Sequence, residues 1–283
     1  MILSLLGCMT LDGFFFNGTP VDGYTLGGDI IPSTCVQEES YSVDANTTLW
    51  GVWVHQPPAV DADCNADEFH ATAPRLLYFH GNGENIDHYW NRMEAYWSLG
   101  YETFTYDYRG YGKSDGDPTY DNTLADGLVT IDHVADVSGT PPEEMAYLGL
   151  SLGGFVAIHD IPKRPPRRFI SEDMFASVQK MLDDGTLISM PSGWMLEEEW
   201  SNVDAAKALP ADIPYLVMHG DSDLYIQPEH AKLVYAAAAS DIKDLWWVKG
   251  SDHGMDFETD PDGYNEHVRC WVEEVDPTVC VGK

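Results

Sequence analysis

Basic residues are scarce in this chain, and the scarcity limits the partners it can have. Only 15 Lys and Arg stand against 47 Asp and Glu among 283 residues, which gives a formal net charge of −32. A surface of this sign repels nucleic acid and anionic membranes, so we expect neither as a partner. The charge favours solubility in a salty or extracellular medium over the alternative role of steering a cationic substrate.

The N-terminus lacks the positive charge with which a secretory signal normally begins, since no Lys or Arg precedes Arg75. Its apolar run is too short to span a membrane. However, Leu5-Leu6-Gly7-Cys8 resembles a bacterial lipobox, in which the cysteine is lipidated. We therefore predict that Cys8 marks the remainder of an export signal and that the protein is extracytoplasmic, secreted or lipid-anchored at the cell envelope. The alternative is an ordinary apolar N-terminus that packs on the domain.

Cysteine is also rare, with five in the chain: Cys8, Cys35, Cys64, Cys270 and Cys280. If Cys8 carries lipid, the other four can form disulfides in three different ways. Proximity along the chain favours Cys35 with Cys64 and Cys270 with Cys280. Such pairs agree with export, whereas the alternative is buried free thiols in a cytosolic protein.

Repeats and low-complexity tracts are absent, and the chain divides into two parts. Residues 1–36 show no clean period and are predicted to be a leader or linker, while residues 37–283 are predicted to form one domain. Within it, strand and helix patterns alternate, which is typical of an α/β fold with a mainly parallel sheet and helices on both faces. The predicted strands are Tyr41–Val43, Leu49–His55, Arg75–Phe79, Tyr101–Tyr106, Met145–Leu150, Arg168–Ile170, Tyr215–His219 and Leu245–Val248. The predicted helices are Ile86–Leu99, Thr123–Val137, Leu152–Asp160, Pro228–Ala238 and Tyr264–Val275.

One glycine-rich turn carries the candidate nucleophile. The strand Met145–Leu150 runs into Gly149-Leu150-Ser151-Leu152-Gly153-Gly154, and a predicted helix follows. This is the G-x-S-x-G pattern of a nucleophilic serine held between a strand and a helix. Small residues on both sides permit a tight turn that exposes the hydroxyl and aims the helix N-terminus at developing negative charge. The alternative is a Gly-rich helix start without chemistry.

A serine hydroxyl is a weak nucleophile and needs a base that a third group orients. His253 lies in a loop after the last predicted strand, which is where such a base is expected. Two aspartates, Asp221 and Asp223, follow the strand before it, and only one can face the histidine. Spacing favours Asp223 as the acid, with Asp221 stabilising the turn. Asp252, next to His253, is expected to point elsewhere.

The candidate oxyanion hole draws on two segments. The backbone N–H of Leu152, just after the nucleophile, is one expected donor. The second is expected from the loop His80-Gly81-Asn82-Gly83 after the strand Arg75–Phe79, and the N–H of Asn82 is our choice. The alternative for this loop is a plain turn.

These stretches, taken together and in this order, resemble the alpha/beta-hydrolase superfamily over about residues 39–275. The resemblance implies a mostly parallel eight-stranded sheet with little or no cap, and it makes the Asp three residues after Gly220 the acid, which is Asp223. It is strongest to the compact serine-aminopeptidase-like and depalmitoylase-like subgroup. The residues that carry it are Tyr78–Gly83, Tyr106–Ser114, Gly149–Gly154, His219–Asp223 and Asp252–Gly254.

The implied activity is a serine hydrolase, carboxylesterase-like, that cleaves a small-molecule ester or thioester through an acyl-enzyme. There are two alternatives. One is a peptidase or amidase that uses the same triad, and the other is a surface-anchored binding module without catalysis. The segment Leu187–Asn202 leaves room for only a small cap, whose Trp194 and Met195 either line an acyl pocket or cover the sheet edge. No His/Cys cluster has metal-ligand spacing, so we expect no metal and no cofactor. The oligomeric state stays open.

Overall fold

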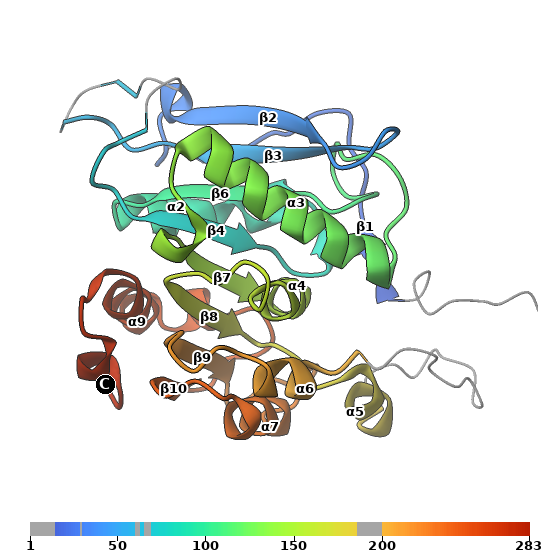
Figure 1. Cartoon of the computed structure of the whole chain (residues 1–283), viewed down its shortest axis with the longest axis vertical. Helices are drawn as coiled ribbons and strands as arrows, with labels where there is room; N and C mark the ends of the chain where they lie inside the picture. Colours follow the sequence, from blue (N-terminus) through green and yellow to red (C-terminus); the bar gives the residue numbers. More distant parts are fainter. Residues whose placement is uncertain (1–14, 29, 60–62, 65–68, 186–199) are drawn as a thin grey trace, which may run out of the picture.

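The computed structural model describes residues 15–28, 30–59, 63–64, 69–185 and 200–283. Its main element is a sheet of eight strands in the order β10-β9-β8-β7-β4-β6-β3-β2, which Figure 1 shows from β2 at the top to β10 at the bottom. The pairs β2–β3 and β3–β6 are antiparallel, and the other neighbours are parallel. The predicted sheet is thus confirmed. Its strands are β2 (Val36–Ser42), β3 (Thr48–Val54), β4 (Arg75–Phe79), β6 (Glu102–Tyr106), β7 (Ala146–Leu150), β8 (Arg168–Glu172), β9 (Tyr215–Gly220) and β10 (Lys243–Val248).

Helices cover both faces of the sheet because successive strand residues point to opposite sides. In β4, Leu77 and Phe79 join one buried cluster, and Leu76 and Tyr78 join the other. The first cluster also contains side chains of α3 (Tyr120–Ser138), α4 (Leu152–Asp160), α6 (Asn202–Lys207) and α7 (Glu229–Ala237). The second contains those of α2 (Trp90–Ser98) and α9 (Pro261–Glu273).

Several element bounds differ from the prediction. The predicted first strand is shorter than β2 and begins later in the sequence. β2 is an edge strand made largely of polar residues, which gives it little apolar signal. The predicted helix Ile86–Leu99 begins as a 3-10 turn, η2 (Ile86–Tyr89), before α2. The short helices α5 (Val178–Asp183), α6 and α8 (Asp256–Thr259) were missed, because each is too short to show a helical period in the sequence. The remaining elements are β1 (Asn17–Gly18), β5 (Gly83–Glu84), η1 (Ser33–Cys35), η3 (Pro142–Glu144) and η4 (Pro277–Cys280).

Both favoured cysteine pairs are disulfides in the structure, Cys35–Cys64 and Cys270–Cys280. Cys8, Trp194 and Met195 lie outside the described residues, as does most of the predicted cap. The division of the chain at residue 36 stays a prediction. None of the helices among the described residues is long and apolar enough to cross a membrane.

Candidate active site

The turn between β7 and α4 holds Ser151 in a backbone conformation that non-glycine residues rarely adopt. Its φ is 52° and its ψ is −108°, and its N–H donates to the Glu172 carbonyl oxygen at 2.8 Å. A methyl group on Gly149 would lie 2.5 Å from the Gly153 oxygen, and one on Gly153 would overlap the Phe79 carbonyl oxygen. The turn therefore needs glycine at both positions. Strain of this kind is concentrated at functional sites.

The structure brings Ser151, His253 and Asp223 into one hydrogen-bonded chain at the carboxyl ends of the strands. His253 Nε2 lies 3.2 Å from Ser151 Oγ, and His253 Nδ1 lies 2.8 Å from Asp223 Oδ2. The other carboxylate oxygen of Asp223 accepts the N–H groups of Tyr225 at 2.8 Å and Ile226 at 2.7 Å. These bonds fix the buried carboxylate with one oxygen facing the histidine.

The neighbouring aspartates have other partners. Asp221 Oδ1 accepts the Gly250 N–H at 2.6 Å and stays exposed, so it joins two loops at the surface. Asp252 Oδ1 accepts the N–H of Leu224 at 3.0 Å and that of His253 at 2.9 Å. Neither side chain reaches the His253 ring, in agreement with the expected orientation of both.

The electrostatic surroundings of His253 favour its protonated form. Burial by itself would lower its pKa. The hydrogen bond to Asp223 and the charges of Asp173, Asp223 and Glu172 outweigh burial, so the pKa of His253 is raised above its ordinary value. A base in this setting can accept a proton from serine and hold the resulting cation.

The two predicted oxyanion donors border the same cavity as Ser151. Leu152 is the first residue of α4, and the first N–H groups of a helix have no acceptor within it. Asn82 follows β4, and its side-chain oxygen accepts the Tyr111 hydroxyl at 2.6 Å and the Asn17 N–H at 3.1 Å. The side chain of Asn82 is thus held in place, and the residue lines the cavity.

The cavity at Ser151 has a volume of about 360 Å³. Its lining includes the apolar side chains of Phe15, Leu150, Leu152, Phe175, Met181 and Met255 beside polar residues. Trp200 lies behind Phe15, with ring centroids 4.5 Å apart, and is not part of the lining. The prediction that Trp194 and Met195 line an acyl pocket stays a prediction.

Known proteins resemble this chain in sequence and in fold. A profile of the family described as serine aminopeptidase, S33, matches residues 71–172. The uncharacterized protein YfhR of Salmonella typhimurium is 27% identical over 190 residues, which cover 63% of this chain and 63% of that protein. Lysophosphatidylserine lipase ABHD12 of Danio rerio is 28% identical over 212 residues, 69% of this chain and 54% of that protein. The chain therefore has the alpha/beta-hydrolase fold and resembles members of that superfamily in sequence.

The alpha/beta-hydrolase fold is also that of a solved structure, the esterase Pf2001 of Pyrococcus furiosus. The two superpose with a TM-score of 0.70 over 90% of this chain and 95% of that one. At 16% identity, this likeness shows the fold alone. The chain spans less than two thirds of the length of the curated relatives YfhR and ABHD12. The predicted alpha/beta-hydrolase fold and the predicted resemblance to that superfamily are confirmed, and the narrower subgroup stays a prediction.

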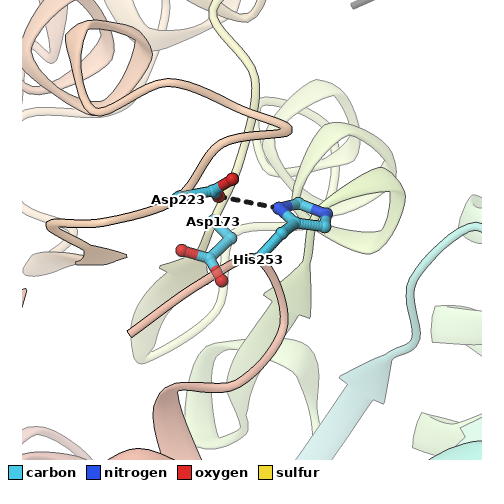
Figure 2. Close-up of side chains that lie close together, drawn as sticks. All are labelled: Asp173, Asp223 and His253. Atoms are coloured by element: carbon cyan, nitrogen blue, oxygen red, sulfur yellow. Dashed lines mark hydrogen bonds and ion pairs between the residues drawn. The ribbon is translucent and has the colours of Figure 1, made fainter. Parts of the chain in front are cut away.

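Asp173 is the residue of this alpha/beta-hydrolase site that sequence reasoning missed. It follows β8 with a φ of 47°, and its carboxylate accepts the Gly220 N–H at 3.0 Å and the Gly254 N–H at 2.7 Å. Figure 2 shows it beside Asp223 and His253, with the dashed bond between the latter two. The only signal in the sequence was an acidic pair, Glu172 and Asp173, at the carboxyl end of a predicted strand.

Asp173, Asp223 and His253 offer ligand atoms within 4.8 Å of one another, a spacing that could hold a metal ion. Here, however, both oxygens of Asp173 already accept backbone N–H groups, and Asp223 faces His253 Nδ1. The cluster is therefore better described as a hydrogen-bond network that ties the acid loop to the base loop.

A buried arginine adds a second tie to the base loop. Arg92 Nη2 lies 2.9 Å from Glu172 Oε1 and donates to the Gly254 carbonyl oxygen at 2.6 Å. Asp256 is buried nearby, and burial together with the charges of Asp173 and Glu172 raises its pKa well above the ordinary value. Its surroundings thus favour the uncharged form of Asp256, which limits the negative charge in this acidic cluster.

Proposed function

We propose that this protein is a serine hydrolase that cleaves carboxylic esters or thioesters through an acyl-enzyme. The observation that carries the proposal is the chain from Ser151 Oγ to His253 Nε2 at 3.2 Å and from His253 Nδ1 to Asp223 Oδ2 at 2.8 Å. A serine, a base and an orienting acid in this arrangement form the nucleophilic unit of acyl transfer.

The reaction follows from the roles of these groups. His253 Nε2 takes the Ser151 proton as Oγ attacks the substrate carbonyl carbon, while Asp223 holds the ring and stabilises its cationic form. The N–H groups of Leu152 and Asn82 stabilise the negative oxygen of the tetrahedral intermediate. His253 then gives its proton to the leaving alcohol or thiol. A water molecule, deprotonated by His253, releases the acyl group and restores Ser151.

The substrate is a small or medium acyl group on an alcohol or thiol. Apolar side chains such as Phe15, Phe175 and Met181 line the cavity of about 360 Å³, which supports an acyl chain as its occupant. Similarity in sequence to a lysophosphatidylserine lipase supports an ester as the bond that is cleaved.

A peptidase or amidase is the second candidate, because the matching family profile is described as serine aminopeptidase. The same triad can attack both kinds of bond. A panel of p-nitrophenyl esters beside aminoacyl anilides separates them. Turnover of the anilides alone would replace the esterase proposal with the peptidase.

We also propose that the protein acts outside the cytoplasm, secreted or anchored through Cys8. The two disulfides support an oxidising compartment. Fractionation of cells that express the protein, combined with palmitate labelling, tests this. Recovery in the cytosol with free thiols would contradict it.

Labelling by a fluorophosphonate probe tests the enzyme proposal directly. We expect the probe to label the wild-type protein and to fail with Ser151→Ala, because the probe reacts only with an activated serine. Ser222→Ala, which removes an exposed hydroxyl near Asp223, is the matched control and should label normally. If the wild type is not labelled, the protein is better explained as a binding module with a hydrolase fold.

A further inference from the structure

Residues 15–26, called here the N-terminal strap, lie across the loop that carries Asn82. The strap forms the short strand β1, which pairs in parallel with β5, with Asn17 opposite Gly83. Beyond β1, the Thr19 N–H donates to the Glu84 carbonyl oxygen at 3.0 Å. The strap therefore extends the loop after β4 into a small sheet of its own.

The Asn82 side chain is held almost entirely by the strap. Its Nδ2 donates to the Phe15 carbonyl oxygen, and its Oδ1 accepts the Asn17 N–H at 3.1 Å. The Tyr111 hydroxyl completes the group, since it donates to Asn82 Oδ1 at 2.6 Å and accepts a bond from the Asn17 N–H at 3.0 Å. A side-chain amide with its donor and its acceptor both engaged has little freedom to turn.

The far end of the strap is anchored in the interior. The Tyr24 hydroxyl donates to Asp107 Oδ2 at 2.5 Å, and the other oxygen of Asp107 lies 3.2 Å from His80 Nε2. Burial and the charge of Asp107 raise the pKa of Tyr24 far above its ordinary value, so the hydroxyl keeps its proton. Asp87 in turn accepts the backbone N–H of Leu26 at 2.7 Å. Both ends of the oxyanion loop are thus tied to the same segment.

The strap also contributes to the cavity. Phe15 is 6% exposed and lines the cavity, with its ring 5.7 Å from that of Phe175 and 4.5 Å from that of Trp200. An acyl chain bound in this cavity would meet the Phe15 ring. Its size therefore limits the length of chain that the cavity accepts.

We propose that the N-terminal strap is an active-site element that positions the Asn82 oxyanion donor and, through Phe15, sets the acyl-chain length. This inference rests on the proposed serine-hydrolase function. The strap residues are positioning residues, because they act on the oxyanion through Asn82. Displacing the strap should lower kcat with little change in KM, since the Asn82 N–H stabilises charge that develops only in the transition state.

Gly18→Ala displaces the strap with a minimal change. A methyl group on Gly18 would lie 2.6 Å from the Tyr111 ring and 2.9 Å from the Gly110 carbonyl oxygen. Gly27→Ala is the matched control, because a methyl group there meets nothing within 4 Å. We expect Gly18→Ala to reduce kcat for a short p-nitrophenyl ester by about tenfold or more, and Gly27→Ala to leave it unchanged.

Hydrogen exchange of the intact protein gives a readout that needs no activity. Peptides that cover residues 80–85 should exchange faster in Gly18→Ala than in Gly27→Ala, while peptides of α9 should be equal in both. Equal exchange in residues 80–85 together with equal kcat would overturn the inference. If the wild type reacts with neither ester nor fluorophosphonate, the proposed function fails, and the exchange data still decide whether the strap holds the loop.

Phe15→Ala tests the effect on chain length, with Phe15→Leu as the conservative partner. We expect the preferred p-nitrophenyl ester to shift to a longer acyl chain in Phe15→Ala and to stay near that of the wild type in Phe15→Leu. The peptide bonds at residue 15, and hence the bond from Asn82, remain in both variants. An unchanged preference in Phe15→Ala would remove the specificity role.

Discussion

The Asp173 carboxylate influences His253 through its charge, although it makes no hydrogen bond to the His253 ring. Asp173 holds the Gly254 N–H at 2.7 Å and thereby fixes the residue next to the base, while its charge is among the causes that raise the pKa of His253. A single buried carboxylate therefore contributes both to the position and to the protonation of the base. The two contributions can be separated by their dependence on pH.

We expect Asp173→Asn to move the acid limb of kcat/KM to lower pH. His253 must be neutral to act as base, so activity appears as pH rises through its pKa. Loss of the Asp173 charge lowers that pKa, because a negative charge near the ring favours its protonated form. The amide also places a donor against a backbone N–H, so plateau activity should fall about threefold to tenfold.

A pH profile of kcat/KM for a p-nitrophenyl ester measures both effects. The profile should run between about pH 5 and 9, a range that brackets the ordinary pKa of histidine. Asp221→Asn is the control, because Asp221 is exposed and keeps its acceptor oxygen for Gly250 in the amide. An acid limb that stays in place in Asp173→Asn would show that Asp173 has no electrostatic role.

At the scale of elements, the contact between β4 and the start of α4 decides which residues the nucleophile turn can contain. Gly153 lies against the Phe79 carbonyl oxygen with no room for a methyl group, whereas Gly154 faces the flexible side chain of Met174. Two adjacent glycines in one helix therefore have different importance. The difference comes from backbone on one side and from a movable side chain on the other.

We expect Gly153→Ala to destabilise the protein by roughly 3 kcal/mol or more, because α4 must move away from β4. Gly154→Ala should change the free energy of unfolding by no more than about 1 kcal/mol, since Met174 can adjust and alanine favours a helix. Urea unfolding of both variants measures the difference. Equal destabilisation would contradict the proposed role of the β4–α4 contact.

For the whole molecule, the excess of acid is the dominant property. Among the described residues, the buried Arg92 and Arg75 form ion pairs with Glu172 and Glu102. Most acidic groups have no basic partner, because 47 Asp and Glu stand against 15 Lys and Arg. The unpaired acidic groups at the surface therefore repel one another. Repulsion of this kind destabilises a compact state and is screened by salt.

We expect the melting temperature to rise by several degrees between about 20 mM and 0.5 M NaCl. The rise should be steepest at low salt, where the screening length changes most. Sucrose at matched osmolality is the control for effects that do not depend on charge. A melting temperature that falls with NaCl would show that attractive surface pairs outweigh the repulsion.

Much of the fold could be predicted because its signals are local. Short apolar runs predicted most strands of the large sheet, the polar edge strand β2 being the one placed poorly, and the helix Leu152–Asp160 was predicted with its observed bounds. Short helices such as α5 and α8 were missed because a helix of so few residues is too short to show a helical period. Asp173 and Arg92 were missed because their partners lie on other loops, far away along the chain.

The sequence by itself determined the alternation of strands and helices, the glycines around Ser151, and the order of Ser151, Asp223 and His253. Each of these depends on short stretches whose steric and hydrogen-bonding needs can be read in isolation. Only the tertiary structure decided that residues 15–26 border the cavity and hold Asn82, and that Asp173 ties the acid loop to the base loop. The physical reason is that these contacts join segments distant in sequence, and such pairings depend on how the sheet brings its strand ends together.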